Sequence, residues 1–300
     1  MMRKLWLMGI VLAAVSLTGC SYFGPCVNGS GPVVTEQREV GEFTGVNNTG
    51  SFDVYLTKAD SFSVEVVAQE SLIPIIETYV SGNTLIIETK SGGCYKSGYP
   101  LQVHVSLPET EVLTLNGSGR VFADVLSSEE LEISNSGSGY MEIDSLMSET
   151  LVLDNSGSGY ISVIGTYVYD IDVSQSGSGD ILCGTLYECS EMDIRHSSSG
   201  RVSALLIDGV VIDVLMSGSG RVDLAGDLEV AEYSLRSSGR LDALDLEVMD
   251  VEATNTGSGN IYLWASDLLN ATITGSGDIV FRGDPKISIR ITGSGSLRPY

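Results

Sequence analysis

The sequence predicts an all-β protein in which a parallel β-solenoid of about ten coils, each of about 20 residues, follows a β-rich N-terminal cap. Three observations support this fold. A Gly-Ser-Gly step recurs along the chain, apolar residues alternate on either side of each step, and no segment of the repeat region has a helical period. A unit of this length with one apolar pattern is typical of stacked coils, which bury their apolar residues against one another.

The repeat is defined by the last glycine of each step, which returns every 18 to 21 residues. Ser precedes this glycine in all ten units, and an apolar residue stands two positions after it. The ten aligned glycines are Gly119, Gly139, Gly159, Gly179, Gly200, Gly220, Gly239, Gly259, Gly277 and Gly295. Residues 113–300 are therefore expected to form the solenoid.

The alternation of strand residues indicates which columns of the repeat face inward. In the unit Leu131–Ile143, both glycines share one face with the apolar residues, and Ser138 lies on the other. Glycines on the inner face predict a corner where two stretches of backbone approach too closely for a Cβ atom. A hairpin at each step, giving an antiparallel meander or an outer-membrane barrel, is the alternative. Few aromatic residues and no aromatic girdle argue against the barrel.

A polar column runs through the predicted core. Asn135, Asn155 and Gln175 occupy one inward position on successive coils, and His196 occupies it on the next. We expect a ladder whose amides bond up and down the stack. His196 is interpreted as a member of this ladder and not as a ligand.

Residues 33–112 are expected to form the cap, because the end of a solenoid exposes strand edges that need cover. The pattern predicts a short helix over residues 70–79, and Asn-Thr-Gly-Ser-Phe at 48–52 resembles a degenerate repeat. Strands are expected at residues 52–56, 63–67, 84–89 and 101–107.

The N-terminus predicts export and lipid attachment. Arg3 and Lys4 precede an apolar run, Leu5–Leu17, which is typical of a secretory signal over residues 1–19 and is too short to span a bilayer. The following Gly19-Cys20 step resembles the lipobox of bacterial lipoproteins. That resemblance implies acylation of Cys20, by palmitate or similar chains, and anchoring at the outer membrane, facing the periplasm or the exterior. Residues 20–32 would be the lipidated tether.

Four further cysteines permit disulfides in an exported protein: Cys26, Cys94, Cys183 and Cys189. Sequence alone leaves three connectivities open. The short spacing of Cys183 and Cys189 favours their pairing within one loop, which would leave Cys26 to pair with Cys94.

Charge and motifs exclude several functions. The formal net charge of −23 disfavours nucleic acid and anionic lipid as partners. The sequence carries no nucleophile elbow, zinc-protease motif or phosphate loop, and His104 and His196 are too few for a zinc site. We therefore expect no catalytic residues, no metal and no cofactor. Asp223 and Asp242, outward on adjacent coils, are the best pair for a polysaccharide-active enzyme, although interleaved Arg and Asp residues usually only compensate charge.

A family resemblance covers nearly all of the chain after the signal. EFTGVNNTGSFDVYLTK at residues 42–58 and LIIET at 85–89 are followed by units such as GSGRV, GSGDI and GSGNI, and by ISIRITGSGSL at 287–297. Together these motifs resemble the head GIN domain family of putative auto-transporter adhesins. The resemblance implies a right-handed β-helix and carries over no functional residues.

Binding is the favoured function. Outward Tyr140 and Tyr160 are expected to stack on adjacent coils, with Tyr262 farther along, and aromatic platforms of this kind suit a glycan or protein ligand. The alternatives are a passive structural protein of the envelope and a polysaccharide-active enzyme. The sequence does not predict the oligomeric state.

Overall fold

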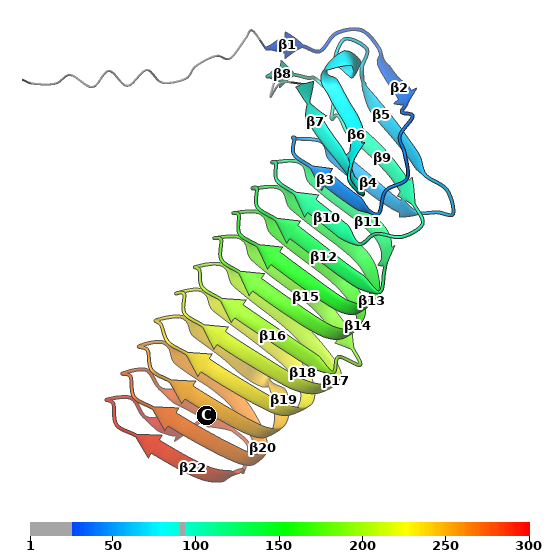
Figure 1. The fold of residues 1–300 in the computed structure, drawn as a ribbon. Helices are drawn as coiled ribbons and strands as arrows, with labels where there is room; N and C mark the ends of the chain where they lie inside the picture. The colour runs from blue at the N-terminus through cyan, green and yellow to red at the C-terminus, as the bar shows by residue number, and fades with distance from the viewer. Residues whose placement is uncertain (1–25, 91–93) are drawn as a thin grey trace, which may run out of the picture.

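The computed structural model describes residues 26–90 and 94–300, which form a long stack of β-coils with a smaller β-rich assembly at one end (Figure 1). The stack is a parallel β-solenoid of about nine turns, which confirms the predicted fold class. The expected signal and Cys20 lie outside the described residues. No helix within the described ranges is long and apolar enough to cross a membrane.

Each full coil contributes to two sheets. We call the segments that follow the Gly-Ser-Gly steps the post-turn sheet and those that precede them the pre-turn sheet. A single long strand usually supplies both, because it bends midway and pairs with a neighbour on each side. The coil strands are β3 (Gly45–Asn48), β4 (Asp53–Lys58), β10 (Val112–Leu115), β11 (Arg120–Ser127), β12 (Glu130–Asn135), β13 (Tyr140–Asn155), β14 (Tyr160–Gln175), β15 (Asp180–Tyr187), β16 (Glu191–His196), β17 (Arg201–Met216), β18 (Arg221–Leu235), β19 (Arg240–Asn255), β20 (Asn260–Ile273), β21 (Ile279–Arg282), β22 (Lys286–Ile291) and β23 (Leu297–Pro299).

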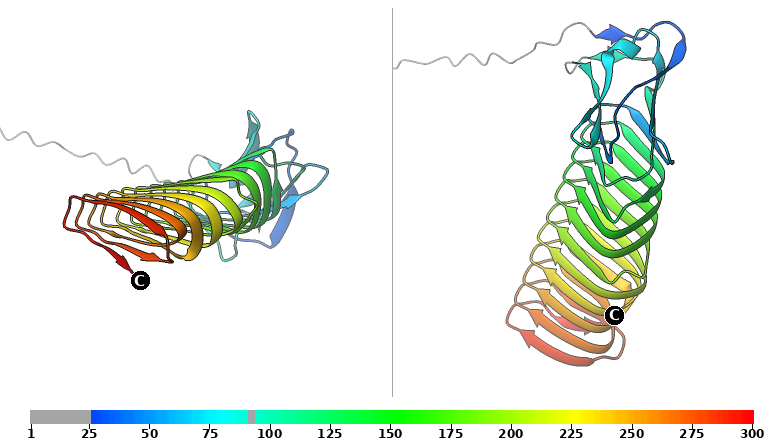
Figure 2. Two further views of the ribbon diagram at one scale, coloured as in Figure 1. Left: turned by 90° about the horizontal axis from the view of Figure 1, so that it is seen from below. Right: turned by 45° about the vertical axis from the view of Figure 1, so that its right-hand side comes forward.

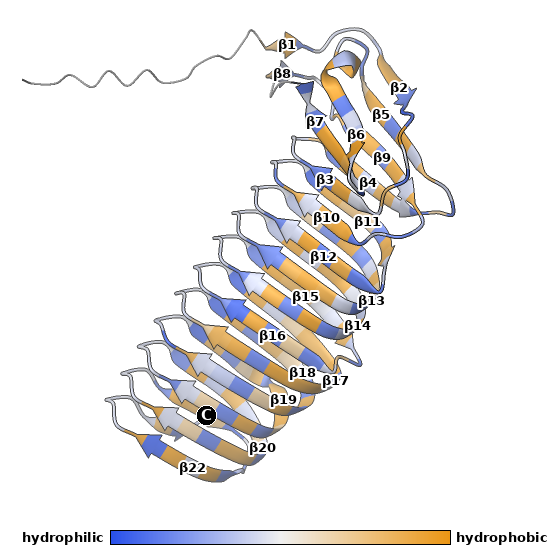
Figure 3. Ribbon diagram, in the orientation of Figure 1, coloured by the Kyte–Doolittle hydropathy of each residue, from blue (hydrophilic) through white to orange (hydrophobic). Residues whose placement is uncertain are grey.

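All pairings between the coils are parallel, so the hairpin alternative is wrong. Like positions align from coil to coil: Ile161 lies between Met141 and Ile181, and all three are fully buried. Seen from below, the coils enclose a narrow interior between the two sheets (Figure 2). Apolar and polar residues alternate along the strands (Figure 3), as burial of one face of each sheet requires.

The cap contains the antiparallel pairings of the described chain, β2–β5, β5–β9 and β6–β7. Its elements are β1 (Val27–Asn28), β2 (Val33–Gln37), β5 (Ser63–Gln69), η1 (Ile73–Ile75), β6 (Ile76–Ser81), β7 (Thr84–Thr89), β8 (Tyr95–Lys96) and β9 (Gln102–Leu107). The helix expected over 70–79 is wrong. Only a 3₁₀ turn forms, and β6 then pairs with β7 through the two-residue loop at Gly82, whose φ of +63° suits glycine.

The stack starts earlier than residue 113. β3 pairs with β10 and β4 pairs with β11, so the degenerate step between them is a true corner. β7 and β9 add a further parallel layer on β3 and β4. The solenoid thus extends into the segment 33–112, and its first layers are covered by β2, β5 and β6.

The glycine corners are close contacts between successive coils. A Cβ atom on Gly137 would lie 1.9 Å from the carbonyl oxygen of Gly117, and one on Gly157 would lie 1.9 Å from that of Gly137. Neither glycine has a positive φ. Glycine is therefore required because the coil before it occupies the space of a side chain. The obstruction lies along the stack and not across the core.

The polar column stabilises these corners. Asn135 is fully buried; its Nδ2 donates to the Gly139 carbonyl at 3.0 Å, and its Oδ1 accepts from the Gly137 N–H at 3.1 Å. His196 Nε2 makes the equivalent bond to the Gly200 carbonyl at 2.8 Å. Each side chain thus bonds the backbone of its own corner, and Asn155 Nδ2 also donates to the Asp180 carbonyl of the next coil at 3.3 Å, so the column bonds along the stack through backbone carbonyls and not from amide to amide.

Candidate functional site

Aromatic side chains form a continuous row on the outer face of the post-turn sheet, at its cap end. We call His104, Tyr55, Phe122, Tyr140 and Tyr160 the aromatic stripe. Successive ring centroids are 4.9, 5.2, 6.3 and 5.2 Å apart, and all pairs except Phe122–Tyr140 are stacked nearly parallel. Parallel pairing aligns His104, Tyr55 and Phe122 in one column and Tyr140 with Tyr160 in the next, so the stripe crosses diagonally from Phe122 to Tyr140.

Tyr140 and Tyr160 lie together as expected, with their rings 5.2 Å apart and 10° from parallel. The Tyr140 hydroxyl donates to the Glu142 carboxylate, and this bond raises the pKa of Tyr140 to about 12. Burial raises the pKa of Tyr160, and nearby Asp180 adds to the effect. Both phenols are therefore neutral donors at physiological pH.

Charged groups border the stripe. Arg120 forms a two-pronged ion pair with buried Asp53, and its guanidinium lies 5.5 Å from the centroid of the Phe122 ring. Glu142 lies on the same strand as Tyr140 and accepts the hydrogen bond from its hydroxyl. Because the rings stack face to face, the stripe offers ring edges to a ligand, with donors and acceptors beside them.

Tyr262 does not join the stripe. It lies on β20, with β15, β17, β18 and β19 between it and Tyr160, and the Arg240 guanidinium covers its ring at 3.9 Å from the centroid. Trp264 is covered in the same way by Arg282, at 4.0 Å. A cation therefore covers one face of each of these two rings.

Asp223 and Asp242 align on adjacent strands, and arginines hold both. Asp223 pairs with Arg221 and with Arg201, whose Nε is 2.6 Å from the Asp223 Oδ2. Asp242 pairs with Arg221 at 3.2 Å and with Arg240 at 2.6 Å. Carboxylates compensated in this way are poorly placed for acid–base catalysis.

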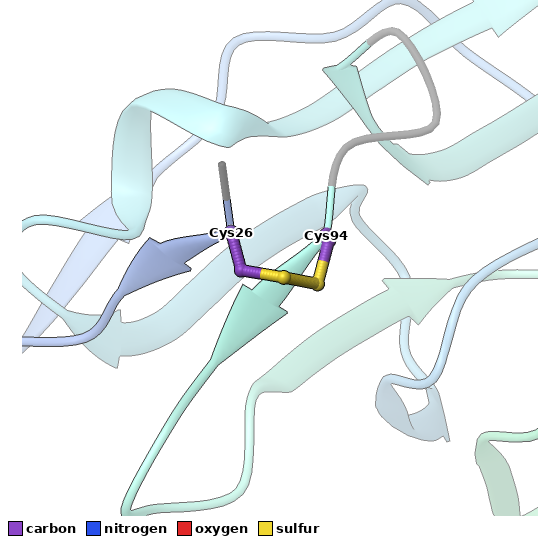
Figure 4. The surroundings of a disulfide bond; sticks show 2 residues. All are labelled: Cys26 and Cys94. Atoms are coloured by element: carbon purple, nitrogen blue, oxygen red, sulfur yellow. A yellow bond between two sulfur atoms is a disulfide. The ribbon is translucent and has the colours of Figure 1, made fainter. Parts of the chain in front are cut away.

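Two of the described cysteines lie in the cap and two lie in the solenoid, which we also call the rod. Cys26 and Cys94 form a disulfide beside β1 and β8, with a Cα–Cα separation of 4.5 Å (Figure 4). The expected pairing of Cys183 with Cys189 needs correction, because both are free thiols in the structure. Cys183 is packed in the core from β15, and the Cys189 thiol donates to the Glu191 carbonyl at 3.4 Å. Burial raises the pKa of both thiols, to about 12 and about 11.

Other surfaces are strongly acidic. A hollow of about 710 Å³ on the pre-turn sheet is lined by Glu109, Glu111, Glu129, Glu130 and Glu132. The described residues contain no group of three or more His, Cys, Asp or Glu side chains arranged to hold a metal ion. This surface repels anions and identifies no particular ligand.

The sequence reasoning missed Tyr55, Phe122 and His104. Two of them could have been found from the repeat. If Phe52 of the degenerate step is aligned with Gly119, Tyr55 falls beside Phe122, and the structure pairs these two residues. His104 had no such signal, because β9 follows an insertion that hides its register with β4.

Comparisons with known proteins agree with this architecture. The family described as "Putative auto-transporter adhesin, head GIN domain" matches residues 42–206 and 175–285. No protein of curated function matches the chain.

Three solved structures share the fold, and each match covers 92% of this chain and all of the other. A putative adhesin from Parabacteroides distasonis is 20% identical with a TM-score of 0.54. A putative lipid binding protein from the same species is 23% identical with a TM-score of 0.52. A putative adhesin from Parabacteroides merdae is 19% identical with a TM-score of 0.54. At these identities the likeness shows the fold alone.

Proposed function

Because the chain belongs to the head GIN domain family of putative auto-transporter adhesins, we propose that it is a non-catalytic binding module of the cell envelope and that its aromatic stripe holds an extended glycan. The observation that carries the proposal is the stripe itself, in which five ring systems follow one another at 4.9 to 6.3 Å on a rigid sheet. The row of ring edges offers an apolar surface along which an extended sugar chain can lie, and the hydroxyls of Tyr140 and Tyr160 add polar groups beside it.

The interior of the rod is filled with side chains, which supports binding of a ligand on the outer surface. Side chains from both sheets fill the space between them, as the full burial of Ile143, Leu153 and Val173 illustrates. A ligand therefore lies along the rod. The strongly negative chain favours neutral or cationic partners over acidic polysaccharides.

The test is a glycan array followed by calorimetry on the soluble domain. Replacing Tyr140 and Tyr160 together with Ser should abolish binding of the array hit while the circular dichroism spectrum stays unchanged. Tyr167 and Tyr187 provide a matched control, because their rings also stack at 4.9 Å but lie outside the stripe. If the control pair abolishes binding, or if the stripe variant binds with wild-type affinity, the proposed site is wrong.

We further propose that acylated Cys20 anchors the protein at the outer membrane. Cys26 is the first described residue and is bonded to Cys94 in the cap. Cys20 lies six residues before it, a separation of at most about 20 Å along the chain. An anchor at Cys20 would hold the cap near the membrane and leave the rod free for a ligand. Cys20→Ser should move the protein out of the detergent phase; retention there at mature length would contradict the anchor.

A further inference from the structure

The coils lose their regularity over one part of the post-turn sheet. Register shifts are confined to the pairings from β15 to β20 among the described strands. One lies between Leu182 and Thr185, and another between Asp223 and Ala225. Beside them, Gly184 and Gly226 have positive φ angles of +56° and +113°. Bulges of this kind re-aim side chains and are frequent next to binding sites.

These two shifts border a hollow of about 520 Å³ on the outer face. We call it the arginine–aspartate hollow and define it by Arg201, Arg221, Asp223, Asp242, Leu182 and Leu205. Its polar walls are the ion-paired residues described above. Leu205, which is 39% exposed, gives it an apolar surface.

The hollow has unused hydrogen-bonding capacity. The Arg201 side chain is 51% exposed, and its two terminal nitrogens form no hydrogen bond among the described residues, so both remain as donors. Arg221 donates from Nε to Asp223 and from Nη2 to Asp242, and its Nη1 remains as a donor. Fixed donors and acceptors beside an apolar surface are what a ring with several hydroxyl groups requires.

We propose that the arginine–aspartate hollow binds a neutral sugar unit of the same glycan that lies on the aromatic stripe. This inference rests on the proposed function. Arg201 and Arg221 are outnumbered by Asp223, Asp242 and Asp245 in the lining, so the hollow does not favour an anionic ligand.

The hollow is in line with the stripe. Tyr140, Tyr160, Asp180, Arg201 and Arg221 occupy one column on five successive strands of the post-turn sheet. Four strand spacings separate Tyr140 from Arg221, a distance of about 19 Å. Only two spacings, about 10 Å, separate Tyr160 from Arg201, so a short oligosaccharide on Tyr160 touches the edge of the hollow, whereas one lying from Tyr140 to Arg221 must be several sugar units long.

The experiment compares oligosaccharides of two lengths. The probes are neutral tri- and hexasaccharides of β-1,4-linked glucose and of N-acetylglucosamine, with hexagalacturonate as the acidic counterpart, and calorimetry gives the affinities. For the neutral hexasaccharide that binds, Arg201→Ala and Leu205→Ser should each weaken binding about tenfold, which corresponds to one or two lost contacts. Trisaccharide binding on the stripe should change less, because a trisaccharide does not extend from Tyr140 to Arg221. Arg195→Ala is the matched control, because Arg195 also bridges two aspartates, Asp172 and Asp193, but on the pre-turn sheet.

The outcomes separate this inference from the proposed function. If the hollow variants bind the hexasaccharide like the wild type while the Tyr140 and Tyr160 variant does not, the hollow is no subsite and the stripe stands. An equal loss from Arg195→Ala also overturns the inference. If folded wild-type protein prefers hexagalacturonate, the neutral-sugar assignment is wrong. If it binds no saccharide, both proposals fail.

Discussion

The coils from β12 to β14 and those from β15 to β19 are built on the same corner but differ in regularity. The aligned glycines from Gly119 to Gly179 are spaced by 20 residues each, whereas the next three intervals are 21, 20 and 19 residues. Even so, the corners stay aligned throughout: His196 pairs with Met216, and Met216 pairs with Leu235. Bulges in the middle of the strands absorb each added or lost residue.

The contacts at the corners explain why the shifts occur elsewhere. A slip of one residue would place a serine Cβ atom where only glycine fits against the carbonyl of the preceding coil. Midway along a strand, a shift disturbs the ladder locally and leaves the next corner in place. Variation in coil length can therefore form a hollow without disrupting the stack.

The largest expected effect comes from breaking a corner of the regular coils. Gly157→Val would place a branched side chain 1.9 Å from the Gly137 carbonyl oxygen, so the two coils must separate. We expect a loss of about 3 kcal/mol in the free energy of unfolding, measured by denaturant titration. Ser158→Ala, at an exposed position of the same corner, should change it by no more than about 0.5 kcal/mol. Equal losses would mean that the corner contact is not what requires glycine.

A smaller loss should follow from removing the polar support of a corner. Asn135→Leu leaves the Gly137 N–H and the Gly139 carbonyl without their side-chain partner in a buried setting. The cost should be about 2 kcal/mol, in the same titration. Ser134→Ala on the same strand is the control, since Ser134 bonds only the Thr114 hydroxyl at the partly exposed surface. A loss below that of the control would show that water replaces the amide.

The regular coils are also where sequence reasoning succeeded. Alternation around the Gly-Ser-Gly step identified the solenoid and the Tyr140–Tyr160 stack, because identical coils repeat every contact. It did not reveal the arginine–aspartate hollow, since a shift such as that between Asp223 and Ala225 depends on how two unequal coils share the strain. It also mispaired Cys183 with Cys189, because spacing along the chain does not show that both thiols are packed in the interior.

The first irregular coil should carry a pH dependence that the Asn and Gln residues at the same position of the regular coils cannot supply. Burial lowers the pKa of His196 below its usual 6.5, although the hydrogen bond to the Gly200 carbonyl and, to a smaller extent, Asp180 oppose this effect. Below pH 6.5 the unfolded chain therefore binds more protons, so the contribution of His196 to stability is complete above that pH and declines as the pH falls. His196→Gln copies Gln175 from the preceding coil and should reduce this decline in unfolding titrations at pH 7.5 and pH 5. An unchanged pH slope would mean that His196 binds its proton equally well in the folded and the unfolded chain.

The smallest effect concerns a single proton on the aromatic stripe. The bond from the Tyr140 hydroxyl to Glu142 stabilises the neutral phenol and raises its pKa from 10 to about 12. Between these two pH values the unfolded chain has lost a proton that the folded chain keeps, so stability is complete below pH 10 and decreases as the pH rises toward 12. Difference absorbance titration of wild type against Tyr140→Phe should place the missing phenol among the last to ionise. Glu142→Gln removes the charged acceptor and should move that ionisation to lower pH while Tyr140 and Tyr160 stay stacked. If the ionisation does not move, the carboxylate is not what holds this proton.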